Sequence, residues 1–208
     1  ARAHGKRAVR NAETNLGDLC ADAYRILLGA DIAFVNGGGV RDNIKVGDIT
    51  YGDIIKVHPF GNEACLVEVT GQQIKDALEL GSAAYPGESG GFLQVSGLTY
   101  EIHTGVASSA EKDENGMFTR VSGEYRVKNV MVGGQPLELD KTYTLASHNY
   151  MLLGHGDGYT MFDGCEVLGE DMMVDNQVLI TYITTTLGGV VGEQYANPYG
   201  DGRIVAVE

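Results

Sequence analysis

The chain has 208 residues, 43% of them hydrophobic, and a formal net charge of −13 at pH 7. This length and composition suit one large globular domain or two small ones. The negative charge argues against a nucleic-acid polymer as partner, because phosphate binding needs clustered Lys and Arg, and no stretch predicts a transmembrane segment in this chain.

Helices and strands follow one another along the chain without strict alternation. Apolar residues at helical spacing predict helices over residues 15–28, 70–85 and 175–187. We expect Asn15 to cap the first of these helices, Gly29 to end it, and Thr70 and Gln73 to form a capping box for the second. Apolar or alternating runs predict strands at residues 31–35, 64–70, 92–103, 123–132, 142–148 and 202–208.

The remaining segments complete the expected architecture. Residues 53–60 are a short apolar segment stopped by Pro59, and the polar, acidic residues 104–118 predict a hairpin tip or a loop. Residues 1–10 are interpreted as a linker remnant and residues 11–208 as one domain. The mixture of elements predicts an α+β fold in which mixed β-sheets are layered with helices.

A run of three glycines follows the predicted strand at residues 31–35. Asn36 precedes the run and Arg41 follows it closely, in the sequence Asn-Gly-Gly-Gly-Val-Arg. Glycines allow a ligand to approach the main chain, and the planar guanidinium of arginine suits a phosphate or carboxylate. No Lys-Ser or Lys-Thr follows, so the run is not a phosphate-binding P-loop. Taken alone, it is also consistent with a simple tight turn.

Two further loops carry aromatic and acidic side chains. Phe60 lies in a Pro-Phe-Gly-Asn turn, where it either faces solvent or closes an edge of the core. Tyr150 precedes a glycine-rich loop that presents Asp157. Two aromatic rings can hold a flat base, a carboxylate can accept hydrogen bonds from sugar hydroxyls, and an arginine can bind phosphate. The combination predicts a nucleotide site.

Five segments, taken in order, identify a family resemblance. They are residues 12–23, 35–42, 47–62, 90–100 and 154–162. Together they make the chain closely resemble, over nearly its whole length, the C-terminal domain of the 5'-nucleotidase / UDP-sugar hydrolase / 2',3'-cyclic-nucleotide phosphodiesterase family. The resemblance implies the fold of that domain and a role in binding the substrate of a metal-dependent nucleotide phosphohydrolase.

The resemblance also implies roles for individual residues. Phe60 and Tyr150 correspond to the two halves of an aromatic clamp around the base. Asp157 corresponds to the acceptor for the ribose hydroxyls, Arg41 to a contact with the phosphate or ribose, and Asn36 to a contact with the base or sugar. The full implied substrate-binding set is Asn36, Gly38, Gly39, Arg41, Phe60, Asn62, Tyr150 and Asp157.

In the family, catalysis belongs to a separate N-terminal domain of the calcineurin-like metallophosphatase type, which holds two divalent metal ions. The present sequence contains none of the DxH, GDxxD or GNHE motifs of such a domain. We therefore expect no catalytic residue and no metal site in this chain, and we expect the chain alone to be inactive.

The resemblance further implies AMP-like nucleotides or nucleosides as ligands, with UDP-sugars and cyclic nucleotides as alternatives, and an extracellular, cell-surface or periplasmic location. A non-catalytic module that binds nucleosides, or one that serves as an interaction surface, remains the alternative function.

Overall fold

The computed structural model describes residues 2–3 and 6–208. Its strands are β1 (Arg2–Ala3), β2 (Lys6–Arg7), β3 (Ile32–Asn36), β4 (Ala64–Thr70), β5 (Leu93–Ser96), β6 (Leu98–His103), β7 (Ala110–Lys112), β8 (Phe118–Val121), β9 (Val127–Val132), β10 (Gln135–Pro136), β11 (Thr142–His148), β12 (Glu166–Gly169) and β13 (Ile204–Val207). Its α-helices are α1 (Asn15–Leu28), α2 (Tyr51–Val57), α3 (Gly71–Ser82), α4 (Asn149–Leu152) and α5 (Asp175–Thr181), which a π-helical turn, η4 (Tyr182–Thr186), extends. Short 3-10 helices are η1 (Ala8–Arg10), η2 (Gly156–Gly158), η3 (Thr160–Phe162) and η5 (Glu193–Tyr195).

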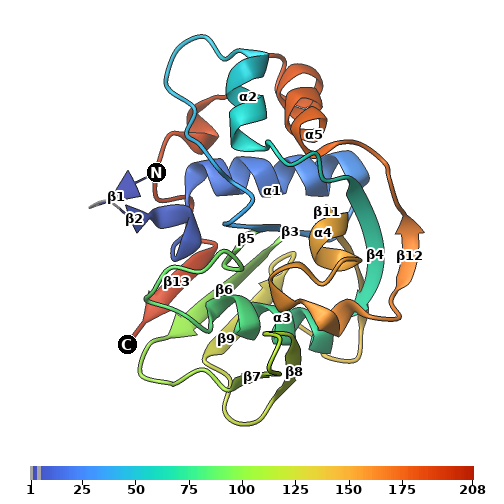
Figure 1. Ribbon diagram of the computed structural model, residues 1–208. Helices are drawn as coiled ribbons and strands as arrows, with labels where there is room; N and C mark the ends of the chain where they lie inside the picture. The colour runs from blue at the N-terminus through green and yellow to red at the C-terminus, as the bar shows by residue number, and fades with distance from the viewer. Residues whose placement is uncertain (1, 4–5) are drawn as a thin grey trace.

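Two mixed β-sheets organise these elements (Figure 1). One has the order β12-β4-β11-β3-β5 and the other the order β10-β9-β6-β13. Each sheet combines parallel and antiparallel pairs, since β3 runs parallel to β11 and β13 runs parallel to β6. The predicted α+β fold of mixed sheets layered with helices is confirmed.

The five-stranded sheet is covered on both faces, which explains why β3 is apolar throughout. Successive side chains of a strand point to opposite faces. Ile32 and Phe34 pack with α3 and the second sheet, whereas Ala33 and Val35 pack with α1 and α5. Figure 1 shows α1, α2 and α5 on one side of this sheet and α3 on the other. A strand buried on both faces is predicted by a continuous apolar run.

Local signals place most helix ends correctly. Gly29 ends α1 in the left-handed conformation, with a φ of 67°, and the Thr70/Gln73 capping box is present at α3. The predicted cap of α1 was wrong by one residue, because the hydroxyl of Thr14 accepts the hydrogen bond from the Gly17 N–H. Asn15 instead donates from its side chain to the carbonyl of Tyr195.

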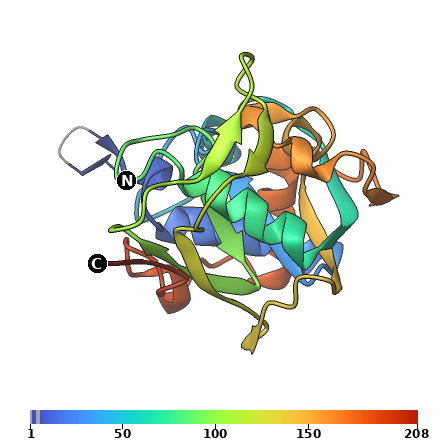
Figure 2. The same ribbon diagram turned by 90° about the horizontal axis from the view of Figure 1, so that it is seen from below.

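The structure defines three segments that the sequence assigned only in outline. Most of residues 53–60 belongs to α2, which a second capping box of Thr50 and Asp53 begins. Residues 92–103 form two strands that belong to different sheets. Residues 104–118 contain β7 and lead to β8, and Figure 2 shows the tip of this hairpin protruding from the molecule. Among the described residues, no helix has the length and apolarity needed to cross a bilayer.

The start of the described chain also packs against the fold. Val9, in η1, is buried in the core beside α1. The boundary predicted between residues 10 and 11 stays a prediction, but the segment immediately before it contributes to the domain's interior.

Candidate functional site

The topology brings three loops to one edge of the five-stranded sheet. Parallel strands β3 and β11 end at Asn36 and His148, with Ile32 opposite Leu145 in the register. Strand β4 is antiparallel to β11 and begins at Ala64, opposite His148. The glycine run after β3, the turn before β4 and the loop after β11 therefore meet at this edge. Carboxyl ends of parallel strands are a common place for ligand sites in α/β sheets.

Asn36 and Asp157 are in direct contact although 121 residues separate them in sequence. The amide Nδ2 of Asn36 donates to Oδ2 of Asp157 at 2.6 Å. Asn36 is buried. Asp157 has a left-handed backbone, with a φ of 57°, and adjoins Gly156 and Gly158. A non-glycine residue in this conformation is uncommon and is often found at functional sites.

The glycine run packs closely against the chain's own backbone. The Gly37 N–H donates to the carbonyl of Phe92 and the Gly38 N–H to that of Gly90, each at 2.7 Å. A Cβ at Gly37 would lie 2.1 Å from the carbonyl oxygen of Val9. The structure therefore gives Gly37 a packing reason, and the substrate contact predicted for Gly38 and Gly39 stays a prediction.

Arg41 and Phe60 come together at the same edge. The guanidinium carbon of Arg41 lies 5.5 Å from the centroid of the Phe60 ring, and the Phe60 side chain is 58% exposed. The structure thus places Phe60 at the surface and not in the core. Arg41 also donates from Nη1 to the carbonyl of Gly38, at 3.3 Å.

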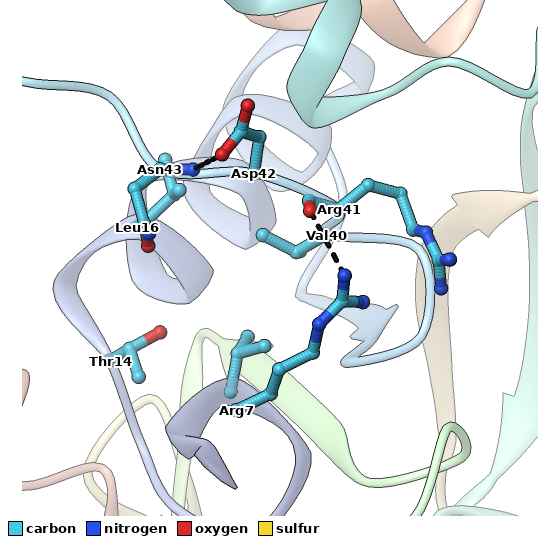
Figure 3. A pocket seen from close by; sticks show the side chains of 8 residues that line it. Arg7, Thr14, Leu16, Val40, Arg41, Asp42 and Asn43 are labelled. Carbon is cyan, nitrogen blue, oxygen red and sulfur yellow. Dashed lines mark hydrogen bonds between the residues drawn. The ribbon is translucent and has the colours of Figure 1, made fainter. Parts of the chain in front are cut away.

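A cavity of about 250 Å³ lies between the N-terminal segment and the chain after the glycine run (Figure 3). The guanidinium of Arg7 reaches across it and donates to the carbonyl of Arg41 at 3.3 Å. Figure 3 shows the Arg41 side chain extending away from Arg7. Two cationic side chains therefore flank this end of the site.

Tyr150 lies at the start of α4 and is 44% exposed. A Cβ at Gly156 would lie 2.2 Å from Cε1 of the Tyr150 ring, so only glycine permits this packing. Burial, followed by the nearby Asp157 carboxylate, raises the pKa of the Tyr150 hydroxyl. Asn149 exchanges hydrogen bonds with the backbone of Glu63, which ties this helix to the turn that carries Phe60.

Two buried histidines, His58 and His148, lie close to the glycine run, and the sequence alone revealed neither their burial nor the bond from His148 to Asn36. His148 Nε2 is 3.1 Å from Oδ1 of Asn36. Burial, followed by the charge of nearby His58, lowers the pKa of His148 to about 3. Burial lowers the pKa of His58 to about 4, against a smaller opposing effect of the Gly39 carbonyl. His58 lies at the bend that ends α2, and its side chain is only 3% exposed.

The backbone of Asn62 is hydrogen-bonded to Asp175. Its backbone N–H donates to Asp175 Oδ2 at 3.2 Å, and its carbonyl accepts from the Asp175 N–H at 2.7 Å. These bonds tie the turn to the start of α5. The substrate contact predicted for Asn62 stays a prediction.

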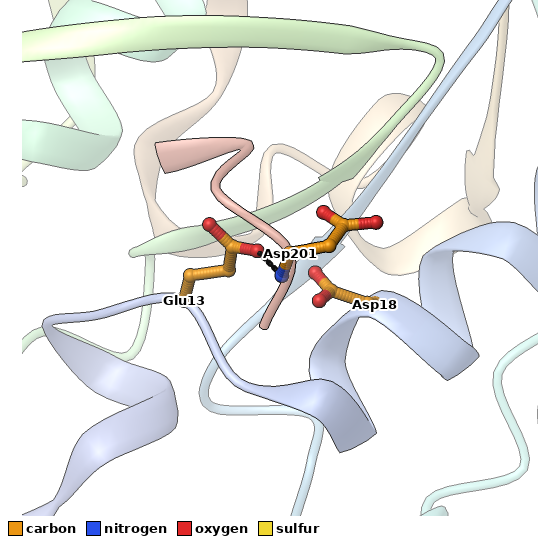
Figure 4. A group of neighbouring side chains, drawn as sticks. All are labelled: Glu13, Asp18 and Asp201. Carbon is orange, nitrogen blue, oxygen red and sulfur yellow. Dashed lines mark hydrogen bonds between the residues drawn. The ribbon is translucent and has the colours of Figure 1, made fainter. Parts of the chain in front are cut away.

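Within the described residues, one group of carboxylates has the spacing of metal ligands (Figure 4). The carboxylate oxygens of Glu13, Asp18 and Asp201 lie within 4.8 Å of one another. However, Glu13 Oε1 already accepts the N–H groups of Asp201 and Gly202. Arg203 Nε lies 3.7 Å from Asp18 Oδ1 and 3.0 Å from Asp201 Oδ1. Arg203 thus lies against two of these three carboxylates, and the cluster fastens the C-terminal segment to α1.

The fold brings aromatic, acidic and basic side chains together at one edge of the five-stranded sheet. The chain belongs to the family of 5'-nucleotidase C-terminal domains, whose sequence model matches residues 2–164. It is 35% identical over 178 residues to a 5'-nucleotidase of Vibrio cholerae, and 35% identical over 203 residues to the trifunctional nucleotide phosphoesterase protein YfkN of Bacillus subtilis. These matches cover 86% and 96% of the chain, but only 28% and 13% of the two relatives.

Solved structures agree with the family. The structure of a 5'-nucleotidase precursor from Thermus thermophilus is similar, with a TM-score of 0.79 and 32% identity. The match covers 98% of the present chain and 37% of the precursor chain. The structure of an NAD nucleotidase of Haemophilus influenzae matches with a TM-score of 0.65 and 20% identity, over 93% of the present chain and 33% of the nucleotidase chain. At this identity the match supports the fold alone. The chain therefore corresponds to the C-terminal part of much longer relatives.

Proposed function

We propose that this chain binds the nucleoside part of a nucleotide for a metal-dependent phosphohydrolase of the 5'-nucleotidase type. The observation that supports this most strongly is the convergence of Asn36, Arg41, Phe60, Tyr150 and Asp157 at one sheet edge, from three separate loops. Each side chain matches one part of a nucleotide in chemistry.

In this proposal Phe60 and Tyr150 hold the base between their rings. Both side chains are substantially exposed, at 58% and 44%, so both rings offer surface to a ligand. Stacking of a base on an aromatic side chain contributes about 1–3 kcal/mol and tolerates any base. The Arg41 guanidinium now rests over the Phe60 ring, so a base that stacks there displaces it.

Asp157 accepts hydrogen bonds from the ribose hydroxyls, and the displaced Arg41 turns to the phosphate. An ionised carboxylate offers acceptors alone, which matches a pair of hydroxyl donors. Arginine provides a permanently charged fork for phosphate oxygens. Asn36, Gly38, Gly39 and Asn62 complete the proposed binding set through polar or main-chain contacts.

The reaction itself, hydrolysis of a phosphate monoester by a metal-activated water, is assigned to the rest of the polypeptide. We propose a metallophosphatase domain with two divalent metal ions there, and an inactive isolated chain. AMP-like nucleotides are the proposed substrates, with UDP-sugars and cyclic nucleotides as alternatives, and the proposed location is extracellular, cell-surface or periplasmic, in line with the resemblance.

Calorimetric titration of this chain with adenosine and with AMP tests the binding role. We expect saturable binding of both ligands, weakened at least about fivefold by Phe60→Ala and by Tyr150→Ala. Arg41→Gln weakens AMP more than adenosine, because adenosine has no phosphate. The matched control is Tyr199→Ala, which removes an aromatic ring that is 73% exposed elsewhere on the chain. Binding that is unchanged in both aromatic variants would place the site elsewhere.

A further inference from the structure

A continuous chain of hydrogen bonds leads from a buried histidine to the proposed ribose acceptor. His148 Nε2 lies 3.1 Å from Oδ1 of Asn36, and Nδ2 of the same amide donates to Asp157 Oδ2 at 2.6 Å. Asn36 and His148 are 4% and 2% exposed. The middle of this chain is therefore shielded from water, which does not compete for its hydrogen bonds.

The chemistry of the three groups fixes the direction of every bond. An ionised Asp157 carboxylate only accepts, so the amide must turn its NH₂ group toward it. The amide oxygen then faces His148 and also only accepts, so the imidazole must carry its proton on Nε2. His148 Nδ1 has no hydrogen-bond partner among the described residues, which is consistent with an unprotonated Nδ1.

The ring of His148 is held in place by its neighbours. Its centroid lies 6.2 Å from that of Tyr24, at an interplanar angle of 71°, and 5.9 Å from that of Tyr150. The same imidazole thus contacts one ring of the proposed base clamp and, through Asn36, the proposed ribose acceptor. Its low pKa keeps it uncharged at neutral pH.

We propose that His148 is a positioning residue, whose Nε2–H fixes the amide of Asn36 and thereby holds the Asp157 carboxylate in the orientation that receives the ribose hydroxyls. This inference rests on the proposed function. Without the Nε2–H donor, nothing fixes which way the Asn36 amide faces, and its hydrogen bond to Asp157 is weakened. The loss is then specific to ligands that carry ribose hydroxyls.

The test compares adenosine with 2',3'-dideoxyadenosine, which lacks both hydroxyls, by titration calorimetry on the 208-residue chain. We expect His148→Leu to reduce the preference for adenosine about tenfold, because Asp157 is then less well oriented to accept the hydrogen bonds of the ribose hydroxyls, and hydrogen bonds to a charged group are the stronger ones. His148→Gln carries an amide N–H in place of the imidazole donor and retains most of the preference. His103→Leu is the matched control, since His103 is on β6 and pairs with Glu101.

The variants separate this inference from the proposed function. Asp157→Asn must abolish the preference for adenosine if Asp157 receives the ribose, whereas Phe60→Ala must weaken both ligands equally. If Asp157→Asn abolishes the preference and His148→Leu leaves it intact, the positioning role is refuted and the proposed function stands. If Asp157→Asn changes nothing, or the chain binds neither nucleoside, the proposed function itself fails.

A measurement on the unmodified chain tests the positioning role of His148 even if His148→Leu does not fold. The nitrogen NMR shifts of the imidazole report which ring nitrogen carries the proton. We expect the neutral Nε2–H tautomer of His148 at neutral pH, in the absence of ligand. An Nδ1–H tautomer, or a charged imidazolium, would overturn the proposal.

Discussion

Asp18 gives this fold a pH-dependent stability whose sign follows from its surroundings. The residue is 2% exposed. Burial, opposed by Arg203 and reinforced by Glu13 and Asp201, raises its pKa from 3.8 to about 8. In the unfolded chain the carboxyl has its ordinary pKa. Between these two values the folded state therefore holds a proton that the unfolded state has lost.

Stability must fall as the pH rises through this window. The proton on Asp18 contributes fully to the stability of the fold below about pH 3.8, and this contribution is lost by about pH 8. At about 1.36 kcal/mol per pH unit, the window sets an upper limit on the order of 6 kcal/mol. Asp18→Asn keeps the shape of the side chain and cannot ionise. Its stability relative to the wild type should therefore increase by roughly 2–5 kcal/mol between about pH 4 and about pH 9.

Urea denaturation followed by circular dichroism, at a series of pH values, measures this difference. Asp22→Asn is the control of opposite sign. Burial raises the pKa of Asp22, but the hydrogen bonds and charge of Arg203 outweigh this and hold the pKa below its ordinary value. The Asp22→Asn substitution should lower the free energy of unfolding most at neutral pH and less in acid. A difference between Asp18→Asn and wild type that is constant with pH, or that favours the wild type in alkali, would show that folding does not raise the pKa of Asp18.

Three further predictions concern packing and exposure. Gly37→Ala should lower the free energy of unfolding by roughly 1–3 kcal/mol in urea, because its Cβ would lie 2.1 Å from the Val9 carbonyl oxygen, whereas Gly105→Ala, with open space around it, should change it by under about 0.5 kcal/mol. Phe60→Ala should leave that free energy within about 1 kcal/mol of wild type, because the ring is exposed and its main contact is a surface cation–π pair. A thiol reagent should label Cys165 before the other two cysteines, which are buried; mass spectrometry of the native chain checks the order.

Local signals in the sequence explain how much of the fold was predictable. The Thr70/Gln73 capping box and the Gly29 stop involve residues a few positions apart, and both are present as expected. Thr14 and Asn15 are both good caps, so the sequence did not distinguish them. Thr50 and Asp53 also have the three-residue spacing of a capping box, and this signal in the sequence would have predicted the start of α2.

The site was predictable only where a residue's role depends on its own chemistry. Asp157 and Phe60 were identified as candidates from their loops and the family resemblance. The hydrogen bond between Asn36 and Asp157 spans 121 residues, and no pattern in one sequence reports such a contact. His148 is the last residue of β11, and Asn36, just before the glycine run, is the last residue of β3. The two residues are seen to be neighbours only once β3 and β11 are paired.

We propose that a nucleoside binds at the edge where β3, β11 and β4 meet. Titration of the isotope-labelled chain with adenosine, followed by amide chemical shifts, tests it most directly. We expect shifts concentrated in residues 36–41, 58–62 and 149–158. Shifts that instead concentrate around the groove lined by Lys75 and Tyr125, or no shifts at saturating ligand, would contradict it.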